Sequence, residues 1–125
     1  MLHLMRNVPP RINRRPVTPE AFVKLVRQWA RDPGTLGGAW TRRRPKRADE
    51  LAGGSVYFVA KGWTLFRAPF AGIERVADFT PDPDPEWADA WAILYEPRPV
   101  MVESRRVYRL QGWRYLTPED APPDV

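Results

Sequence analysis

A run of basic residues, RRRPKR at positions 42–47, has the clearest chemical consequence in this sequence. It leads into the segment 45–52, where a second helix is expected, closed by a Gly-Gly pair. Positive side chains beside a helix N-terminus oppose the helix dipole, so the arrangement is unfavourable unless an anion binds there. Backbone N–H groups and arginines can then converge on one phosphate. The alternative interpretation is a solvated basic loop, partly neutralised by Asp49 and Glu50.

Aromatic residues lie near basic residues along the chain, which is the mixture that a site for single-stranded nucleic acid needs. Trp63 and Trp113, each next to a glycine, are the tryptophans that we least expect to be fully buried. For any single aromatic ring, packing in the core is the alternative. Arginines between positions 6 and 15 either extend this site or form a mobile, solvated arm. The predicted nucleic-acid-binding residues are Arg42, Arg43, Arg44, Lys46, Arg47, Lys61, Trp63, Arg67, Trp113 and Arg114.

Groups that carry catalysis or bind metals are few. There is no cysteine, which excludes disulfides, thiolate metal sites and cysteine nucleophiles. His3 is the only histidine and lies in an apolar segment, where a packed ring is expected. Ser55 and Ser104 lack the surroundings of a nucleophile motif. Prolines interrupt the acidic run at 82–89, which also lacks the glycine of a calcium loop. We expect no catalytic residue, no metal and no cofactor.

The formal net charge of +5 is unevenly distributed. Residues 1–47 hold twelve basic and two acidic residues, whereas residues 48–103 hold four basic and ten acidic ones. Such asymmetry can steer a polyanion toward one face. We therefore expect a nucleic-acid partner, RNA first. The alternative is an adaptor that docks an acidic protein, with its own acidic loop at 81–89 as a second contact. A third hypothesis, an enzyme acting on a modified nucleotide, needs a deep pocket around His3, Glu50 or Glu103.

The pattern along the chain predicts a single domain over residues 1–125, with a polar tail at 117–125. Thr18 and Pro19 begin an amphipathic helix that ends at residues 32–34, and 45–52 is the second helix. Short strands are expected at 2–5, 56–60, 63–76, 90–95, 100–103 and 107–116. The predicted fold is α+β: a small, partly closed, mainly antiparallel β-barrel with two helices near the N-terminus. The short apolar stretch at the N-terminus predicts neither a signal peptide nor a membrane span, and the cytoplasm is the default compartment.

Three segments carry a resemblance to a known family: MLHLMR, PKRADELAGGSVYFVAKG and LQGWRYLTPEDAPPDV. Together they resemble an uncharacterised bacterial family, domain-of-unknown-function family 1489. The order of a basic helix, a glycine turn, the strand SVYFVAKG and the apolar strand around AGIERV also resembles PUA-like barrels, which include the ASCH and EVE domains. That second resemblance implies a PUA-like fold and binding of RNA or modified bases.

Overall fold

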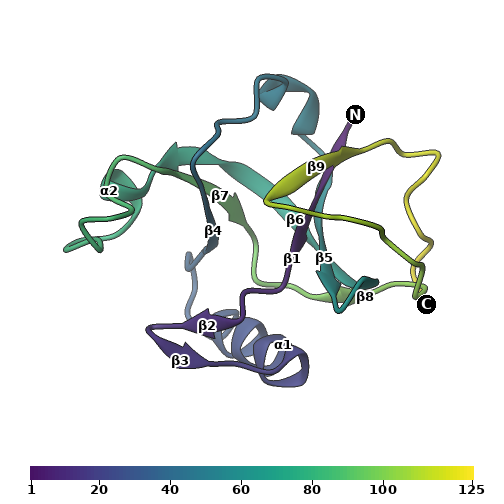
Figure 1. The fold of residues 1–125 in the computed structure, drawn as a ribbon, viewed down its shortest axis with the longest axis horizontal. Coiled ribbons are helices and arrows are strands. Elements are labelled where there is room, and N and C mark those ends of the chain that lie inside the picture. The colour runs from purple at the N-terminus through teal and green to yellow at the C-terminus, as the bar shows by residue number, and fades with distance from the viewer.

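The computed structural model describes residues 1–125 and combines one large sheet with two helices and a small hairpin (Figure 1). The strands of the large sheet are β1 (His3–Asn7), β4 (Gly37–Thr41), β5 (Ser55–Ala60), β6 (Trp63–Arg75), β7 (Trp91–Tyr95), β8 (Val100–Met101) and β9 (Trp113–Leu116). The other elements are the hairpin β2 (Arg11–Ile12) and β3 (Arg15–Pro16), the helices α1 (Pro19–Trp29) and α2 (Val76–Phe79), and the 3₁₀ turn η1 (Ala48–Leu51). The predicted α+β class is confirmed. None of the helices has the length and apolar character that crossing a bilayer requires.

The main path of the sheet runs β4-β7-β6-β5-β1-β9, and β8 pairs with β6 beside this path. All of these pairs are antiparallel except β1 with β5. The sheet is not closed into a barrel, because no ladder of backbone hydrogen bonds joins β4 to β9. The predicted barrel closure is therefore wrong. Side chains span the gap instead: Arg6 donates to the Trp40 oxygen (2.6 Å), and the Trp113 indole N–H donates to the Arg43 oxygen (3.0 Å).

Helix α1 begins where the sequence predicts. The Thr18 side chain accepts from the Ala21 N–H (3.1 Å), and Pro19 occupies the first helical turn. Phe22, Val23 and Val26 are buried against the sheet in the largest core cluster, which also contains Val56 and Phe58 of β5 and Phe66 of β6. The amphipathic spacing therefore places one face of α1 against the sheet.

The second predicted helix, 45–52, is reduced to the single 3₁₀ turn η1. No side chain caps its start, Pro45 is buried before it, and Gly53 (φ 80°) ends it in the left-handed region. The backbone is not helical at Arg47 (φ −97°, ψ 38°) or at Ala52 (φ −57°, ψ 128°), so only the four residues between them form the turn.

Strands β5 and β6 form a hairpin across the two-residue turn Lys61-Gly62, both of positive φ (52° and 82°). This conformation matches the twist of a hairpin and favours glycine at the second position. Two strand pairs are not predicted from the sequence, β4 with β7 and β2 with β3. β4 has the sequence GGAWT and reads as a loop, and the hairpin β2–β3 reverses at Asn13-Arg14, also both of positive φ.

Candidate nucleic-acid interface and an aromatic pocket

The predicted basic run 42–47 lies in the loop between β4 and η1, and all of its basic side chains are exposed. Each arginine of the run lies against an aromatic ring. The pairs, with the distance from the guanidinium carbon to the ring centroid, are Arg42 and Trp87 (3.9 Å), Arg43 and Trp113 (4.5 Å), Arg44 and Trp91 (5.2 Å), and Arg47 and Tyr115 (5.5 Å). The protein's own cations thus cover these rings.

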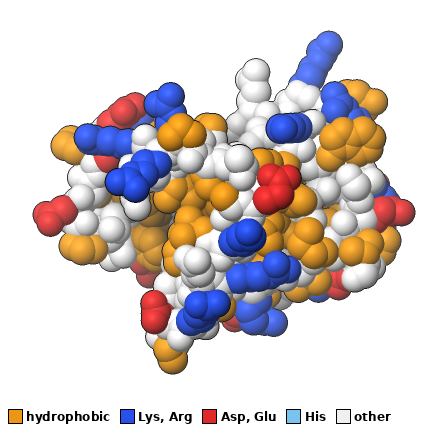
Figure 2. Space-filling view, turned by 90° about the horizontal axis from the view of Figure 1, so that it is seen from below, with side chains coloured by type: hydrophobic (Ala, Val, Ile, Leu, Met, Phe, Trp, Pro, Cys, Tyr) orange, Lys and Arg blue, Asp and Glu red, His pale blue; other side chains and the backbone are white.

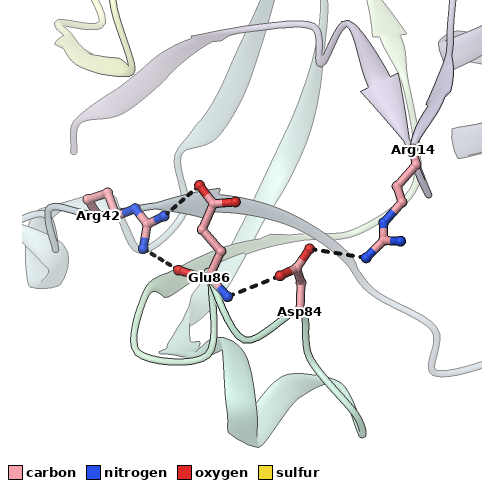
Figure 3. Close-up of polar contacts among 4 residues, drawn as sticks. All are labelled: Arg14, Arg42, Asp84 and Glu86. Carbon is pink, nitrogen blue, oxygen red and sulfur yellow. Dashed lines mark hydrogen bonds and ion pairs between the residues drawn. The ribbon is translucent and has the colours of Figure 1, made fainter.

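Two arginines of this run also hold carboxylates. Arg42 donates to the backbone oxygen of Glu86 and lies 3.4 Å from its Oε1 (Figure 3). Arg47 donates to both carboxylate oxygens of Glu50, and this contact lowers the pKa of Glu50. The Arg47 backbone N–H is already used by the Tyr115 hydroxyl (2.9 Å). The predicted phosphate site depended on the N-terminus of an α-helix at 45–52, and η1 is only a 3₁₀ turn in its place. The exposed basic side chains of residues 42–47 remain.

Two other predicted residues have structural contacts. Trp113 is only 6% exposed and packs edge to face on Tyr115, with the ring centroids 4.9 Å apart. Our expectation that Trp113 is incompletely buried is wrong, because its indole N–H finds the Arg43 oxygen and its ring fills the core. Arg67 donates to both oxygens of the Asp124 carboxylate at 2.8 Å and to Ser55 at 3.1 Å. Residue 124 therefore ties the predicted polar tail to β6.

Three predicted residues contact residues outside the predicted set. Lys61 and Trp63 contact Arg106, and Arg114 contacts Tyr108. Trp63 pairs with Arg106 in an isolated β-bridge, and the Arg114 side chain donates to the Tyr108 oxygen at 2.9 Å. The Arg106 side chain also contacts the Lys61 oxygen at 3.4 Å. We call this surface the basic aromatic patch. Its members are Lys61, Trp63, Arg106, Tyr108, Arg109 and Arg114.

Two exposed rings and one guanidinium lie at the centre of the basic aromatic patch. Trp63 is 46% exposed and Tyr108 is 69% exposed. The Arg106 guanidinium carbon lies 5.6 Å from the Trp63 centroid and 5.2 Å from that of Tyr108. No basic residue of the patch has a carboxylate within 4.0 Å, unlike Arg42, Arg47 and Arg67. The patch therefore carries net positive charge together with two rings that stay largely exposed beside the Arg106 guanidinium.

The structure does not bring the predicted residues into one site. The basic run at 42–47 precedes η1, which leads into the start of β5, whereas Lys61 and Trp63 follow the end of β5. β9 lies between the two groups, because Trp113 contacts Arg43 and the next residue, Arg114, contacts Tyr108. Arg106, Tyr108 and Arg109 of the patch are not among the predicted binding residues. The sequence that indicates them is RRVYR at 105–109, where a tyrosine lies among arginines. The sequence pattern assigns most of that segment to the last strand, which in fact begins at Trp113.

A pocket of about 480 Å³ lies between β1, α1, β4, β7 and the hairpin β2–β3, and it includes none of the predicted binding residues in its lining. Figure 2 views the molecule from the side of α1 and this hairpin, and shows apolar side chains gathered in the middle of the face with Lys and Arg around them. The aromatic residues in the pocket wall are Phe22, Trp29, Trp40, Phe58, Phe79, Trp87 and Tyr95. Arg6 and Arg11 also line it.

Glycines make room for two rings in this wall. A Cβ atom on Gly37 would lie 2.3 Å from the Tyr95 ring, and one on Gly38 would lie 2.6 Å from the Trp40 ring. The GGAW sequence of β4 is therefore required by close approach of aromatic rings. The sequence alone does not reveal why these positions are glycine, because the close approach of the rings is a feature of the fold.

The hairpin β2–β3 and the acidic loop both contribute to the pocket, since Asn13 and Trp87 line it. Arg14 reaches across to Asp84 (3.9 Å), whose carboxylate also accepts from the Glu86 N–H (Figure 3). The Arg14 side chain is 90% exposed. Exposed ion pairs contribute about 0–1 kcal/mol, so this contact joins the hairpin to the acidic loop only weakly.

His3, Glu50 and Glu103, around which the enzyme hypothesis requires a pocket, do not line this one. His3 is 6% exposed, its Nδ1 accepts from the Ser55 N–H at 2.9 Å, and its ring packs edge to face on Tyr57. Burial lowers the pKa of His3, so the ring stays neutral at physiological pH. These contacts describe a packed, hydrogen-bonded histidine.

Residues 19–125 match the family described as Protein of unknown function (DUF1489). This match covers most of the α+β chain, so the protein belongs to the DUF1489 family, as the sequence resemblance predicted. The match includes two of the three segments that carried the resemblance, and MLHLMR precedes it. Neither a curated protein nor a solved structure matches the chain.

Proposed function

We propose that the protein binds single-stranded nucleic acid, RNA in particular, through the basic aromatic patch. The observation that carries the proposal is the arrangement of Trp63, Arg106 and Tyr108, two exposed rings with a guanidinium close to both. Exposed rings beside cations that make no ion pair mark a candidate binding surface. A single strand supplies both partners, because its bases stack on rings and its phosphates attract cations.

The chemistry of each side chain follows from its place in the patch. Lys61, Arg109 and Arg114 are exposed and are suited to phosphate contacts, which are electrostatic and independent of sequence. The Arg106 guanidinium is planar and can itself stack on a base. A PUA-like fold is the finer part of this proposal. The passage from η1 through Gly53-Gly54 into β5 supports it, and the open sheet separates this chain from a closed barrel.

The phosphate contacts can be tested with two matched triple variants. R106Q/R109Q/R114Q removes three cations from the patch, and R42Q/R43Q/R44Q removes the same charge from the predicted basic run. Affinity for a labelled oligouridylate is measured by fluorescence anisotropy at several salt concentrations. We expect the patch variant to lower the slope of log affinity against log salt by about 0.7 for each phosphate that the protein no longer binds. The other variant should keep the wild-type slope.

The stacking contacts are tested with Trp63→Ala and Tyr108→Ala. Each should cost about 1–3 kcal/mol of binding free energy and leave the salt slope nearly unchanged. If R42Q/R43Q/R44Q abolishes binding while the patch variants do not, the interface lies at residues 42–47 and the patch proposal is wrong. If the wild type binds neither RNA nor DNA at low salt, nucleic-acid binding is wrong and an acidic protein partner becomes the function to test.

A further inference from the structure

Two basic side chains line the aromatic pocket, Arg6 and Arg11, and of these only Arg6 is partly buried. It lies on β1 and donates from one nitrogen to the Trp40 backbone oxygen, 2.6 Å away. No carboxylate lies within 4.0 Å of it. Burial lowers the pKa of Arg6, which reflects a charged form that is poorly compensated. An unpaired cation in an apolar environment costs free energy, and a bound anion would recover it.

The remaining donors of Arg6 are available to a molecule in the pocket. Its other side-chain nitrogens make no hydrogen bond to protein atoms. Since no fully buried side-chain nitrogen or oxygen lacks a partner, these nitrogens are accessible, and Arg6 lines the pocket. A guanidinium presents its N–H groups in a planar fork that matches a carboxylate or phosphate group.

Tyr95 adds a second donor by the same reasoning. Its side chain is 1% exposed, yet its hydroxyl has no hydrogen-bond partner in the protein and is accessible from the pocket it lines. Gly37 leaves this hydroxyl free, because a Cβ there would lie 2.7 Å from it. Burial raises the pKa of Tyr95, so the hydroxyl keeps its proton and can donate it.

The walls define the rest of the ligand. Trp40 packs edge to face on Phe79, with ring centroids 5.6 Å apart, and Trp87, which lies under Arg42, packs against the same small apolar cluster. A volume of about 480 Å³ holds a small organic molecule. Flat aromatic rings fit a wall of this kind by stacked and edge contacts.

We propose that this pocket binds a small planar aromatic molecule that carries an anionic oxygen group, with the anion on Arg6 and Tyr95 and the ring against the aromatic wall that includes Trp40 and Trp87. This site is separate from the basic aromatic patch. It is a ligand site of its own, and it does not rest on the proposed nucleic-acid function.

The probes are 2-naphthoate and its neutral isostere 2-naphthamide, with binding measured by isothermal titration calorimetry. Wild-type protein should bind the naphthoate at least about tenfold more tightly, because a hydrogen bond to a charged group contributes more than a neutral one. Arg6→Met should abolish this preference and leave naphthamide binding within about threefold of wild type. Arg15→Met, on the same face but outside the pocket, should keep it.

Two further arms identify the anion and protect the test against misfolding. Comparing the affinities for 5′-AMP and adenosine asks whether the pocket accepts a phosphate in place of the carboxylate. The variant Arg6→Lys keeps the positive charge but lacks the planar N–H groups of the guanidinium. Equal binding of the naphthoate and the naphthamide by wild type overturns the proposal whether or not any variant folds. Unchanged preference in Arg6→Met overturns it as well. R106Q/R109Q/R114Q should bind the naphthoate like wild type, so failure of the patch proposal is distinguishable from failure of this one.

Discussion

Trp63 and Trp113 are the same residue type in similar local sequences, yet their rings have opposite environments. Trp63 follows Gly62 at the start of β6 and is 46% exposed. Trp113 follows Gly112 at the start of β9, is 6% exposed, and donates its indole N–H to the Arg43 oxygen. The acceptor is seventy residues away in sequence. A neighbouring glycine therefore does not predict exposure, because burial depends on a partner that only the fold supplies.

This difference leads to a prediction for stability. Trp113→Phe leaves the Arg43 oxygen without its donor and removes ring volume from the core, so it should lower the free energy of unfolding by about 1–3 kcal/mol. Trp63→Phe should change it by less than about 0.5 kcal/mol, as for exposed positions in general. Urea unfolding followed by circular dichroism measures both. Equal destabilisation of the two variants would contradict the assigned environments.

Helix α1 is the element whose boundaries the sequence predicts best, because its signals are local. Thr18, Pro19 and the apolar spacing of Phe22 and Val26 act within the helix itself. β4 escapes prediction for the opposite reason. Its Gly37 and Gly38 lower strand propensity, and they make room for the rings of Tyr95 from β7, Phe79 from α2 and Trp40 from β4 itself. Elements are predictable where their causes lie in their own sequence.

The cap of α1 gives a prediction at the scale of one element. Thr18→Ala removes the acceptor for the Ala21 N–H and should lower the free energy of unfolding by about 0.5–2 kcal/mol. Thr18→Ser keeps the oxygen and should retain most of the stability. Chemical denaturation of the two variants checks this. If Ser is as damaging as Ala, the hydroxyl contact is not what stabilises the helix start.

Strand β9 is short but pairs with β1 through four residues, from His3 opposite Leu116 to Arg6 opposite Trp113. A chain truncated after Arg109 lacks this pairing together with two buried side chains, Trp113 and Leu116. Each contributes roughly 1.5–3 kcal/mol when buried, which together is comparable to the whole stability of a small protein. We expect no cooperative unfolding transition in this truncated chain by differential scanning calorimetry. A transition near the wild-type temperature would contradict the prediction.

At the scale of the whole molecule, charge is paired across long distances in sequence. The acidic loop brings Asp84 to Arg14 and Glu86 to Arg42, so carboxylates from the acidic middle neutralise part of the basic N-terminal segment. The unpaired cations of the basic aromatic patch then lie mostly in the C-terminal segment, which has almost no net charge of its own. The sequence reveals the asymmetry of charge but not which charges meet. This is why the predicted binding residues include only part of the basic aromatic patch.

The contact between Arg67 of β6 and Asp124 of the C-terminal segment makes the stability of the fold depend on pH. The hydrogen bonds from Arg67 lower the pKa of the Asp124 carboxyl below its usual value of about 4. The stability that this contact contributes is therefore present above pH ~4 and disappears as the pH falls through the lower value of the folded state. Asp124→Asn should have a lower melting temperature than wild type at pH 7, and the difference should shrink toward zero under strongly acidic conditions. A difference that stays constant with pH would show that the Asp124 charge does not stabilise the fold.

The position of β1 has a consequence for how the chain is made. β1 lies between β5 and β9, so residues such as Leu4 find their first partner strand only when Val56 has been synthesised. Their second partner, β9, is translated later still. A nascent chain on the ribosome therefore presents an apolar strand with two unsatisfied edges for much of its synthesis. Such a strand is prone to aggregation and is a natural target for chaperones that shield nascent chains.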